Sequence, residues 1–191
     1  MKLSAVVQLI DGFSQAPAVG FQPRFLLNQK PFMPLAKPQA FYAFSDLDDG
    51  DYRLTALAPQ FFAQEVAFQV PLRLPLAAAI VPCYLAPSPL YPYPPGTTLI
   101  RGQVLQAGSK SPLAGVSVSA SYPNRQGKPK SAATLSSDYG KYDGRYALAL
   151  GGKLAQDTQV VLSFSKAGYA SVEKQLLLQS ATTQFVDIEM R

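Results

Sequence analysis

A proline-rich stretch near the middle of the chain, residues 86–96, constrains the fold more than any other feature. It reads Ala-Pro-Ser-Pro-Leu-Tyr-Pro-Tyr-Pro-Pro-Gly and holds five of the 17 prolines. Because proline lacks a backbone N–H and its ring fixes φ, such a run forms neither a helix interior nor a central strand. The stretch therefore predicts a linker between two domains, which we place at residues 1–85 and 97–191.

Each flanking part is large enough for a small domain. Of the 191 residues, 48% are hydrophobic, so each part can bury a core. The longest apolar run, residues 76–81, is far shorter than the ~20 residues of a membrane helix, so no membrane span is predicted. Residues 1–7 resemble a signal peptide only faintly, because Gln8 and Asp11 interrupt the apolar start. We interpret them as a first strand, and expect a cytoplasmic assembly or an extracellular particle.

Neither the cysteine content nor the net charge indicates a specialised site. Cys83 is the one cysteine, so an intramolecular disulfide is impossible, and a buried or half-buried thiol is expected. The net charge of +5 comes from Lys and Arg residues that fall mainly in predicted turns. A nucleic-acid site needs a basic stripe interleaved with exposed aromatic side chains. A solvated loop surface is therefore favoured, and no nucleic-acid partner is predicted.

The chain contains no histidine. This excludes Ser-His-Asp and Cys-His catalysis and the usual zinc hydrolase sites, which use two or three imidazoles. The acidic turn at residues 46–51 fails the EF-hand pattern, because Asp51 stands where Gly is needed and Leu57 where Glu is needed. We interpret it as a hairpin turn, and predict no catalytic residue, no cofactor and no metal site.

Short runs of alternating apolar and polar residues recur along the chain, and no segment has a sustained helical period, so an all-β fold is predicted. The clearest strands are expected at residues 51–57, 64–74 and 113–120, and another at 19–27. Residues 31–38 are expected to be irregular because they contain three prolines, and residues 122–129 are expected to form a polar loop.

The two halves repeat each other. Ser14–Pro17 matches Ser109–Pro112 ahead of a strand, and Tyr52–Phe61 matches Val160–Tyr169 in character, each a strand that runs into a turn ending in an aromatic residue. A duplicated domain explains both matches.

The second half resembles the carboxypeptidase regulatory-like domain, a transthyretin-like β-sandwich. The matching segments are Ile100–Val104, Pro112–Val118, Ser137–Tyr142 and Leu162–Tyr169. Residues 1–85 resemble a divergent copy, with Gln60 in place of the usual Gly before the closing aromatic residue. The resemblance implies two tandem Ig-like or transthyretin-like sandwiches that serve as a spacer, an adhesive module or a docking surface. It also implies one of two roles for the chain: an accessory protein of a phage-tail-like contractile injection particle, or an envelope module that binds glycans.

Three hypotheses about function follow. The leading one is a non-enzymatic structural protein that docks onto protein partners in an assembly of unknown stoichiometry, through edge strands or loop tips. The second is a glycan- or ligand-binding module that uses exposed tyrosines; the candidates are Tyr84, Tyr91, Tyr93, Tyr122, Tyr139, Tyr142 and Tyr169. The third is an enzyme built on the charged turn of Asp138, Lys141 and Asp143, for which a solvated turn is the favoured interpretation.

The linker itself supplies the candidate interaction residues. Its alternating Tyr and Pro favour polyproline II, a semi-rigid extended conformation. Leu90, Tyr91 and Tyr93 are too apolar to remain wholly in water, so we expect them to pack onto the neighbouring domain ends and to set the angle between the domains. The candidate residues are Leu90, Tyr91, Pro92, Tyr93, Pro94 and Pro95.

Overall fold

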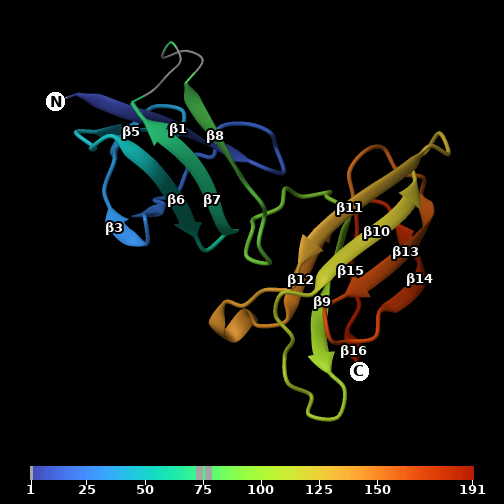
Figure 1. Ribbon diagram of the computed structural model, residues 1–191. Helices are drawn as coiled ribbons and strands as arrows, with labels where there is room; N and C mark the ends of the chain where they lie inside the picture. The colour runs from blue at the N-terminus through green and yellow to red at the C-terminus, as the bar shows by residue number, and fades with distance from the viewer. Residues whose placement is uncertain (1, 72–74, 76–78) are drawn as a thin grey trace. The chain divides into compact units, whose positions relative to one another are not determined.

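The computed structural model describes residues 2–71, 75 and 79–191, and the all-β prediction is confirmed: the regular structure of these residues is strands, apart from one short 3₁₀ turn at Gly140–Tyr142 (Figure 1). The chain divides into two compact units, Met1–Leu90 (unit 1) and Tyr91–Arg191 (unit 2). Part of the apolar run at 76–81 and the end of the strand expected at 64–74 lie outside the described residues.

Unit 1 is a sandwich of two four-stranded sheets, with strand orders β4-β5-β1-β8 and β3-β2-β6-β7. The strands are β1 Leu3–Asp11, β2 Arg24–Leu27, β3 Lys30–Phe32, β4 Leu35–Lys37, β5 Phe41–Ser45, β6 Gly50–Ala58, β7 Phe61–Val70 and β8 Ile80–Leu85. β1 pairs with β5 in the antiparallel sense and with β8 in the parallel sense.

Unit 2 is also a sandwich. One sheet has the order β11-β10-β13-β14, and the other has β12-β9-β15 with β16 paired to β9. The strands are β9 Leu99–Gln106, β10 Ser117–Pro123, β11 Pro129–Leu135, β12 Arg145–Ala149, β13 Asp157–Ser165, β14 Val172–Gln179, β15 Thr183–Phe185 and β16 Ile188–Met190. β9 pairs with β12 in the antiparallel sense and with β15 and β16 in the parallel sense.

The strand pairings of unit 1 recur in unit 2. The sheet with strand order β3-β2-β6-β7 corresponds to the sheet with order β11-β10-β13-β14. The first strand of each unit lies between one antiparallel and one parallel neighbour. The matched segments Ser14–Pro17 and Ser109–Pro112 form the same loop, because both prolines make an isolated bridge to the preceding strand, Ile10 with Pro17 and Leu105 with Pro112. The matching backbone hydrogen bonds recur 95 residues later, from the N–H of Asp11 to the carbonyl of Ala16 and from Gln106 to Ser111.

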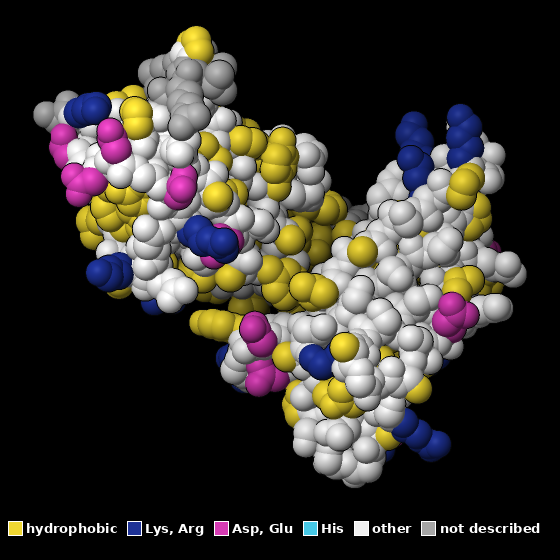
Figure 2. Space-filling view, in the orientation of Figure 1, with side chains coloured by type: hydrophobic (Ala, Val, Ile, Leu, Met, Phe, Trp, Pro, Cys, Tyr) yellow, Lys and Arg dark blue, Asp and Glu magenta, His cyan; other side chains and the backbone are white. Residues whose placement is uncertain are grey.

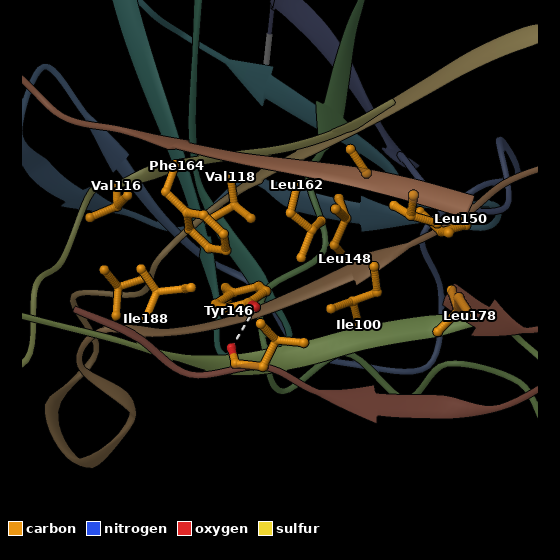
Figure 3. Packing of buried hydrophobic residues seen from close by; sticks show 14 of the residues in the cluster. Ile100, Val116, Val118, Tyr146, Leu148, Leu150, Leu162, Phe164, Leu178 and Ile188 are labelled. Carbon is orange, nitrogen blue, oxygen red and sulfur yellow. Dashed lines mark hydrogen bonds between the residues drawn. The ribbon is translucent and has the colours of Figure 1, made fainter. Parts of the chain in front are cut away.

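The core of unit 2 is mainly aliphatic, with Tyr146 and Phe164 in edge-to-face contact at its centre (Figure 3). The Tyr146 hydroxyl donates a hydrogen bond of 2.7 Å to the carbonyl of Val186, the dashed line in Figure 3. This contact depends on Gly102, since a Cβ at Gly102 would lie 1.9 Å from the Val186 carbonyl oxygen. The carbonyl thus occupies the space of a side chain, and β15 ends just before it.

The core of unit 1 contains a cluster of aromatic rings among its aliphatic residues. Phe44 is fully buried and its ring centre lies 5.4 to 6.2 Å from those of Phe25, Phe32 and Phe68. Tyr52 stacks on Phe68 at 5.6 Å. Offset and edge-to-face ring pairs of this kind stabilise a core beyond the area that they bury.

Three local predictions are wrong. Residues 31–38 are not wholly irregular: β3 and β4 form there as short outer strands of their sheets, where a proline leaves few ladder bonds unmade. The strand expected at 19–27 begins only at Arg24, and Val19 is exposed. The strand expected at 113–120 begins at Ser117, because Gly115 adopts a φ of +68° in a turn, and it continues through Tyr122 into the predicted loop.

Candidate functional site

The first part of the proline-rich segment, residues 86–90, extends the β7 edge of unit 1. The N–H of Phe62 donates to the carbonyl of Ala86 (2.8 Å), and the N–H of Ser88 donates to the carbonyl of Gln60 (3.0 Å). The buried Ser88 hydroxyl donates to the carbonyl of Pro59 at 2.7 Å and accepts the N–H of Leu90 at 3.1 Å. This part is therefore fixed by backbone and side-chain hydrogen bonds, as a strand would be.

The second part, residues 91–96, is fixed by ring contacts. Tyr91 is buried, and its ring lies edge-on to that of Tyr93 with the ring centres 4.7 Å apart. The guanidinium of Arg101 lies 5.7 Å from the centre of the Tyr93 ring, a cation–π contact. The polyproline II interpretation is wrong here, because hydrogen bonds from Tyr93 N–H to the Tyr91 carbonyl and from Thr97 N–H to the Pro94 carbonyl fold the segment into turns.

The predicted site residues differ in burial according to residue type. Tyr91 is buried and Leu90 and Tyr93 are half-buried, whereas the three prolines are exposed; these are Pro92, Pro94 and Pro95. The expectation that apolar residues of the segment leave water agrees with this pattern. That they set an angle between two domains stays a prediction. Sequence reasoning missed Ser88 and Arg101. The signal for Ser88 was its hydroxyl, which stands alone between two prolines that have no backbone N–H to donate.

Of the seven tyrosines proposed as ligand contacts, two are buried, three are half-buried and two are exposed. Tyr91 and Tyr122 are buried, while Tyr84 and Tyr139 are 53% and 58% exposed. Tyr142 is half-buried and contacts two cations, with Lys141 Nζ 5.3 Å and the Arg145 guanidinium 5.8 Å from its ring centre. The exposed aromatic surface of this set is thus concentrated on Tyr84 and on the turn that carries Tyr139.

The charged turn proposed for an enzyme consists of Asp138, Lys141 and Asp143. Within the part of the chain that the structure describes, no ion pair joins Lys141 to Asp138 or Asp143. The Asp143 Oδ1 atom is buried without a hydrogen-bond partner, and its main-chain carbonyl accepts from Gln103 Nε2 at 3.0 Å. Among residues 2–71, 75 and 79–191, no group of three metal-ligating side chains comes together. In the same residues, no helix has the length and hydropathy needed to cross a membrane.

The titratable groups with clear pKa shifts are one cysteine and three tyrosines, all of which have pKa values raised by burial. Burial raises the pKa of the Cys83 thiol to about 11, so the thiol stays protonated near neutral pH, as the expected buried cysteine should. Burial, with a smaller contribution from the charge of Asp187, raises the pKa of Tyr146. Burial also raises the pKa of Tyr42 and Tyr122. None of these shifts activates a nucleophile or an acid.

Sequence reasoning also missed an apolar groove of about 480 Å³ on unit 1. Met33 at its rim is 94% exposed. The lining residues are Arg24, Phe25, Leu26, Pro31, Phe32, Met33 and Leu57. Nothing in the sequence pattern marks it, because it forms only where β2 and β3 meet the end of β6.

No known family model matches this sequence, and no curated protein matches it. The chain aligns over most of its length with several solved structures, at TM-scores below 0.5. The TIE protein of Bacillus anthracis is 9% identical, with 98% of this chain and 34% of that chain covered and a TM-score of 0.34. A streptococcal ancillary pilin is 12% identical (98% and 62% covered, TM-score 0.32). The shaft pilin SpaA of Lactobacillus rhamnosus GG is 9% identical (100% and 98% covered, TM-score 0.33).

The chain therefore spans less than two thirds of the length of the first two of these structures. All three similarities are low in both sequence identity and superposition. The assignment of two sandwiches therefore depends on the strand pairings of this chain alone.

Proposed function

We propose that this chain is a non-enzymatic structural or docking protein that packs onto protein partners in a larger assembly. The observation that carries the proposal is the proline-rich segment. A flexible tether would leave such a segment in water, whereas here residues 86–90 are hydrogen-bonded to β7 and residues 91–93 are held by ring contacts. A segment whose two parts are both fixed by contacts suits a structural protein, in which a linker limits the movement of the domains that it joins.

Open sheet edges support the docking part of the proposal. β14 is an eight-residue outer strand with Leu177 59% exposed, and β11 is the outer strand on the other side of the same sheet, with Leu135 45% exposed. Such edges present unpaired backbone groups that a partner strand can complete.

The proposal is tested on the segment itself. Replacing Tyr91–Pro95 with an alternating Gly/Ser sequence removes the ring contacts and the fixed φ angles. We expect small-angle scattering to show a broader distribution of interatomic distances than the unchanged protein gives. A control replaces the exposed Pro92 alone with Ala. An unchanged distribution in the Gly/Ser variant would contradict a geometric role.

The specific form of the proposal is an accessory component of a phage-tail-like contractile injection particle, as the family resemblance implies. The resemblance to carboxypeptidase regulatory-like domains remains part of this proposal. It is supported by the structural need for glycine within its motifs, at Gly102 beside the Val186 carbonyl and at Gly168 in the turn before Tyr169. Affinity purification from the source cells, followed by mass spectrometry, tests it; sheath, tube or baseplate proteins are the expected partners, and their absence argues against this form.

A second candidate function is a glycan- or ligand-binding module at a cell surface. Tyr139 is the observation that favours it, because its exposed ring lies three residues from Tyr142, which contacts both Lys141 and Arg145. A glycan array with the native chain and a Tyr139→Ala variant tests this candidate. Binding that Tyr139→Ala removes, and that the matched change Tyr84→Ala leaves intact, is the expected result; no binding at all ends it.

A further inference from the structure

The charge of the chain is unevenly divided between the two sandwiches. Unit 1 carries six Lys and Arg against six Asp and Glu, whereas unit 2 carries eleven against six. The whole net charge of +5 therefore belongs to unit 2. The asymmetry is sharpest at one end of each sandwich, where the turns β2–β3 and β5–β6 of unit 1 and their counterparts in unit 2 are found.

This end of unit 1 is acidic. The β5–β6 turn holds Asp48, Asp49 and Asp51, which are all exposed, and the structure records no ion pair for any of them among the residues it describes. The Tyr52 hydroxyl donates to the Asp48 carbonyl at 2.9 Å, which helps to hold the turn. The carboxylate of Asp46 accepts the N–H of Lys2. Among the residues that the structure describes, Lys2 and Lys30 are the exposed cations near this turn and Arg53 pairs with Glu65, so the described part of this end is net negative.

The corresponding end of unit 2 is basic. The N–H of Arg125 in the β10–β11 turn donates to the carbonyl of Lys153 in the β12–β13 loop at 2.8 Å, so the two connections form one surface. The Asn124 Oδ1 atom accepts two backbone N–H groups and fixes the turn. The exposed cations of this surface are Arg125, Lys128, Lys130 and Lys153. Asp157 is the carboxylate at this end, and no ion pair is recorded for it or for the four cations in the described part of the chain.

The two surfaces are counterparts in the repeated fold. The β2–β3 turn corresponds to the β10–β11 turn, and the β5–β6 turn corresponds to the β12–β13 loop. In unit 1, hydrogen bonds between Asn28 and the backbone of Arg53 hold the β2–β3 turn against the start of β6, which directly follows the β5–β6 turn. Figure 2 shows Lys and Arg side chains at the end of the β10–β11 hairpin and Asp and Glu side chains gathered on unit 1. One structural position thus carries opposite charge in the two units.

We propose that the basic end of unit 2 (Arg125, Lys128, Lys130 and Lys153) binds the acidic end of unit 1 (Asp48, Asp49 and Asp51) of a second copy of this chain. The inference deepens the proposed function, since it names a second copy as one of the partners. Two different patches that complement each other make a head-to-tail contact, which extends into a ring or a filament. Charge complementarity of this kind directs encounter and orientation more than it adds affinity.

The expected contact is weak and sensitive to salt. Each exposed ion pair contributes about 0.2–1 kcal/mol, and screening shortens the range of the interaction from about 30 Å at 0.01 M salt to about 3 Å at 1 M. Sedimentation velocity of the full chain at both salt concentrations is therefore the first measurement. We expect species larger than a monomer at low salt that increase with protein concentration and disappear at high salt. A monomer under all conditions overturns the inference.

Neutralising each end separately tests which surfaces meet. We expect neither Asp48→Asn/Asp49→Asn nor Lys128→Gln/Lys130→Gln to associate alone at low salt. A 1:1 mixture retains one compatible pair of ends, so it should form heterodimers and nothing larger. The control Lys141→Gln/Lys174→Gln removes the same amount of charge away from this end and should associate normally.

The charge-swapped variant Asp48→Lys/Asp49→Lys/Lys128→Glu/Lys130→Glu should associate again, because both ends are reversed together. Association that survives either neutralising pair, or that nuclease treatment removes because a nucleic acid bridges the basic ends, overturns the inference. Its failure is separable from failure of the proposed function: a chain that stays monomeric but still co-purifies with other proteins loses the inference and keeps the docking role.

Discussion

Unit 1 and unit 2 repeat one strand order with different side chains in the core. Phe25 faces Ala56 across β2 and β6, while the corresponding pair across β10 and β13 is Val118 and Phe164. The large and small members have exchanged strands. All four side chains are buried, so the fold needs a filled volume at this position and not a particular residue on a particular strand.

A second pair shows the same compensation. Ala5 faces Phe44 in unit 1, whereas Ile100 faces Leu148 in unit 2. A small residue opposite a large one in one core corresponds to two residues of intermediate size in the other. Two diverged copies of one fold can therefore keep their packing density while their sequences lose nearly all identity.

The units differ most where unit 2 admits a main-chain carbonyl into its core. Gly102 of β9 occupies the position that Val7 occupies in β1. With no Cβ at Gly102, the Val186 carbonyl lies beside the sheet and accepts the Tyr146 hydroxyl, and the parallel neighbour is split into β15 and β16. In unit 1 the parallel neighbour β8 is continuous. The interruption of this strand in unit 2 thus coincides with the loss of one side chain, at Gly102.

The largest expected effect is a break in unit 2 alone. Gly102→Ala places a Cβ where the Val186 carbonyl now lies, and the clash is with backbone that cannot rotate away. We expect unit 2 to lose about 3 kcal/mol or more of stability, from overpacking and from the lost Tyr146 hydrogen bond. Hydrogen–deuterium exchange measured by mass spectrometry should show loss of protection in β9, β15 and β16 and little change in β1. The control Gly151→Ala, with open space around its Cβ position, should be nearly neutral.

The next effect tests volume compensation. Ala5→Ile overfills the core of unit 1 beside Phe44 and should cost about 1–3 kcal/mol. Adding Phe44→Leu recreates the size combination of unit 2, so the double variant should be more stable than the sum of the single changes predicts, by about 0.5–3 kcal/mol. Urea denaturation of all four chains measures the coupling; strict additivity would mean that the two cores are not interchangeable in this way.

A smaller effect should appear only in alkali. The folded-state pKa of Cys83 is raised to about 11 from a usual 9, so the folded thiol holds its proton where the unfolded thiol loses it. The stabilising contribution is complete below pH 9 and declines as the pH rises from 9 towards 11. The counterpart residue in unit 2 is Ile188, which does not titrate. Cys83→Val should therefore flatten the decline of the urea midpoint between pH 9 and 10; an unchanged slope would exclude Cys83 as its cause.

The smallest expected effect compares the two parts of the proline-rich segment. Ser88→Ala removes two hydrogen bonds at a buried hydroxyl and should cost about 1 kcal/mol or more. Arg101→Ala removes a cation–π contact with Tyr93 and should cost about 0.5–1 kcal/mol. Hydrogen exchange of residues 86–97 separates the two, since each change should loosen only its own part. Loosening of the whole segment by either change would show that it behaves as one unit.

Much of the fold was predictable because alternation marks a half-buried strand. The face of Tyr52, Leu54 and Ala56 was correct, and so was that of Phe68 and Val70. Prediction failed where a chain reversal depends on one φ angle, as at Gly115, or where a proline-containing strand forms at a sheet edge, as at Pro31. Of the candidate site, the withdrawal of Tyr91 and Tyr93 from water followed from their apolar rings. The role of Ser88 did not, because its partners are 29 and two residues away in sequence.

The sequence by itself determined that the chain is all-β, that a proline-rich segment interrupts it, and that histidine chemistry is absent. These are properties of composition and local periodicity, which act over a few residues. Only the tertiary structure decided that the proline-rich segment is hydrogen-bonded to β7 and that one end of the repeated sandwich carries opposite charge in the two units. These facts depend on which distant turns the strand pairing brings together, and a pairing between residues far apart leaves no local mark in the sequence.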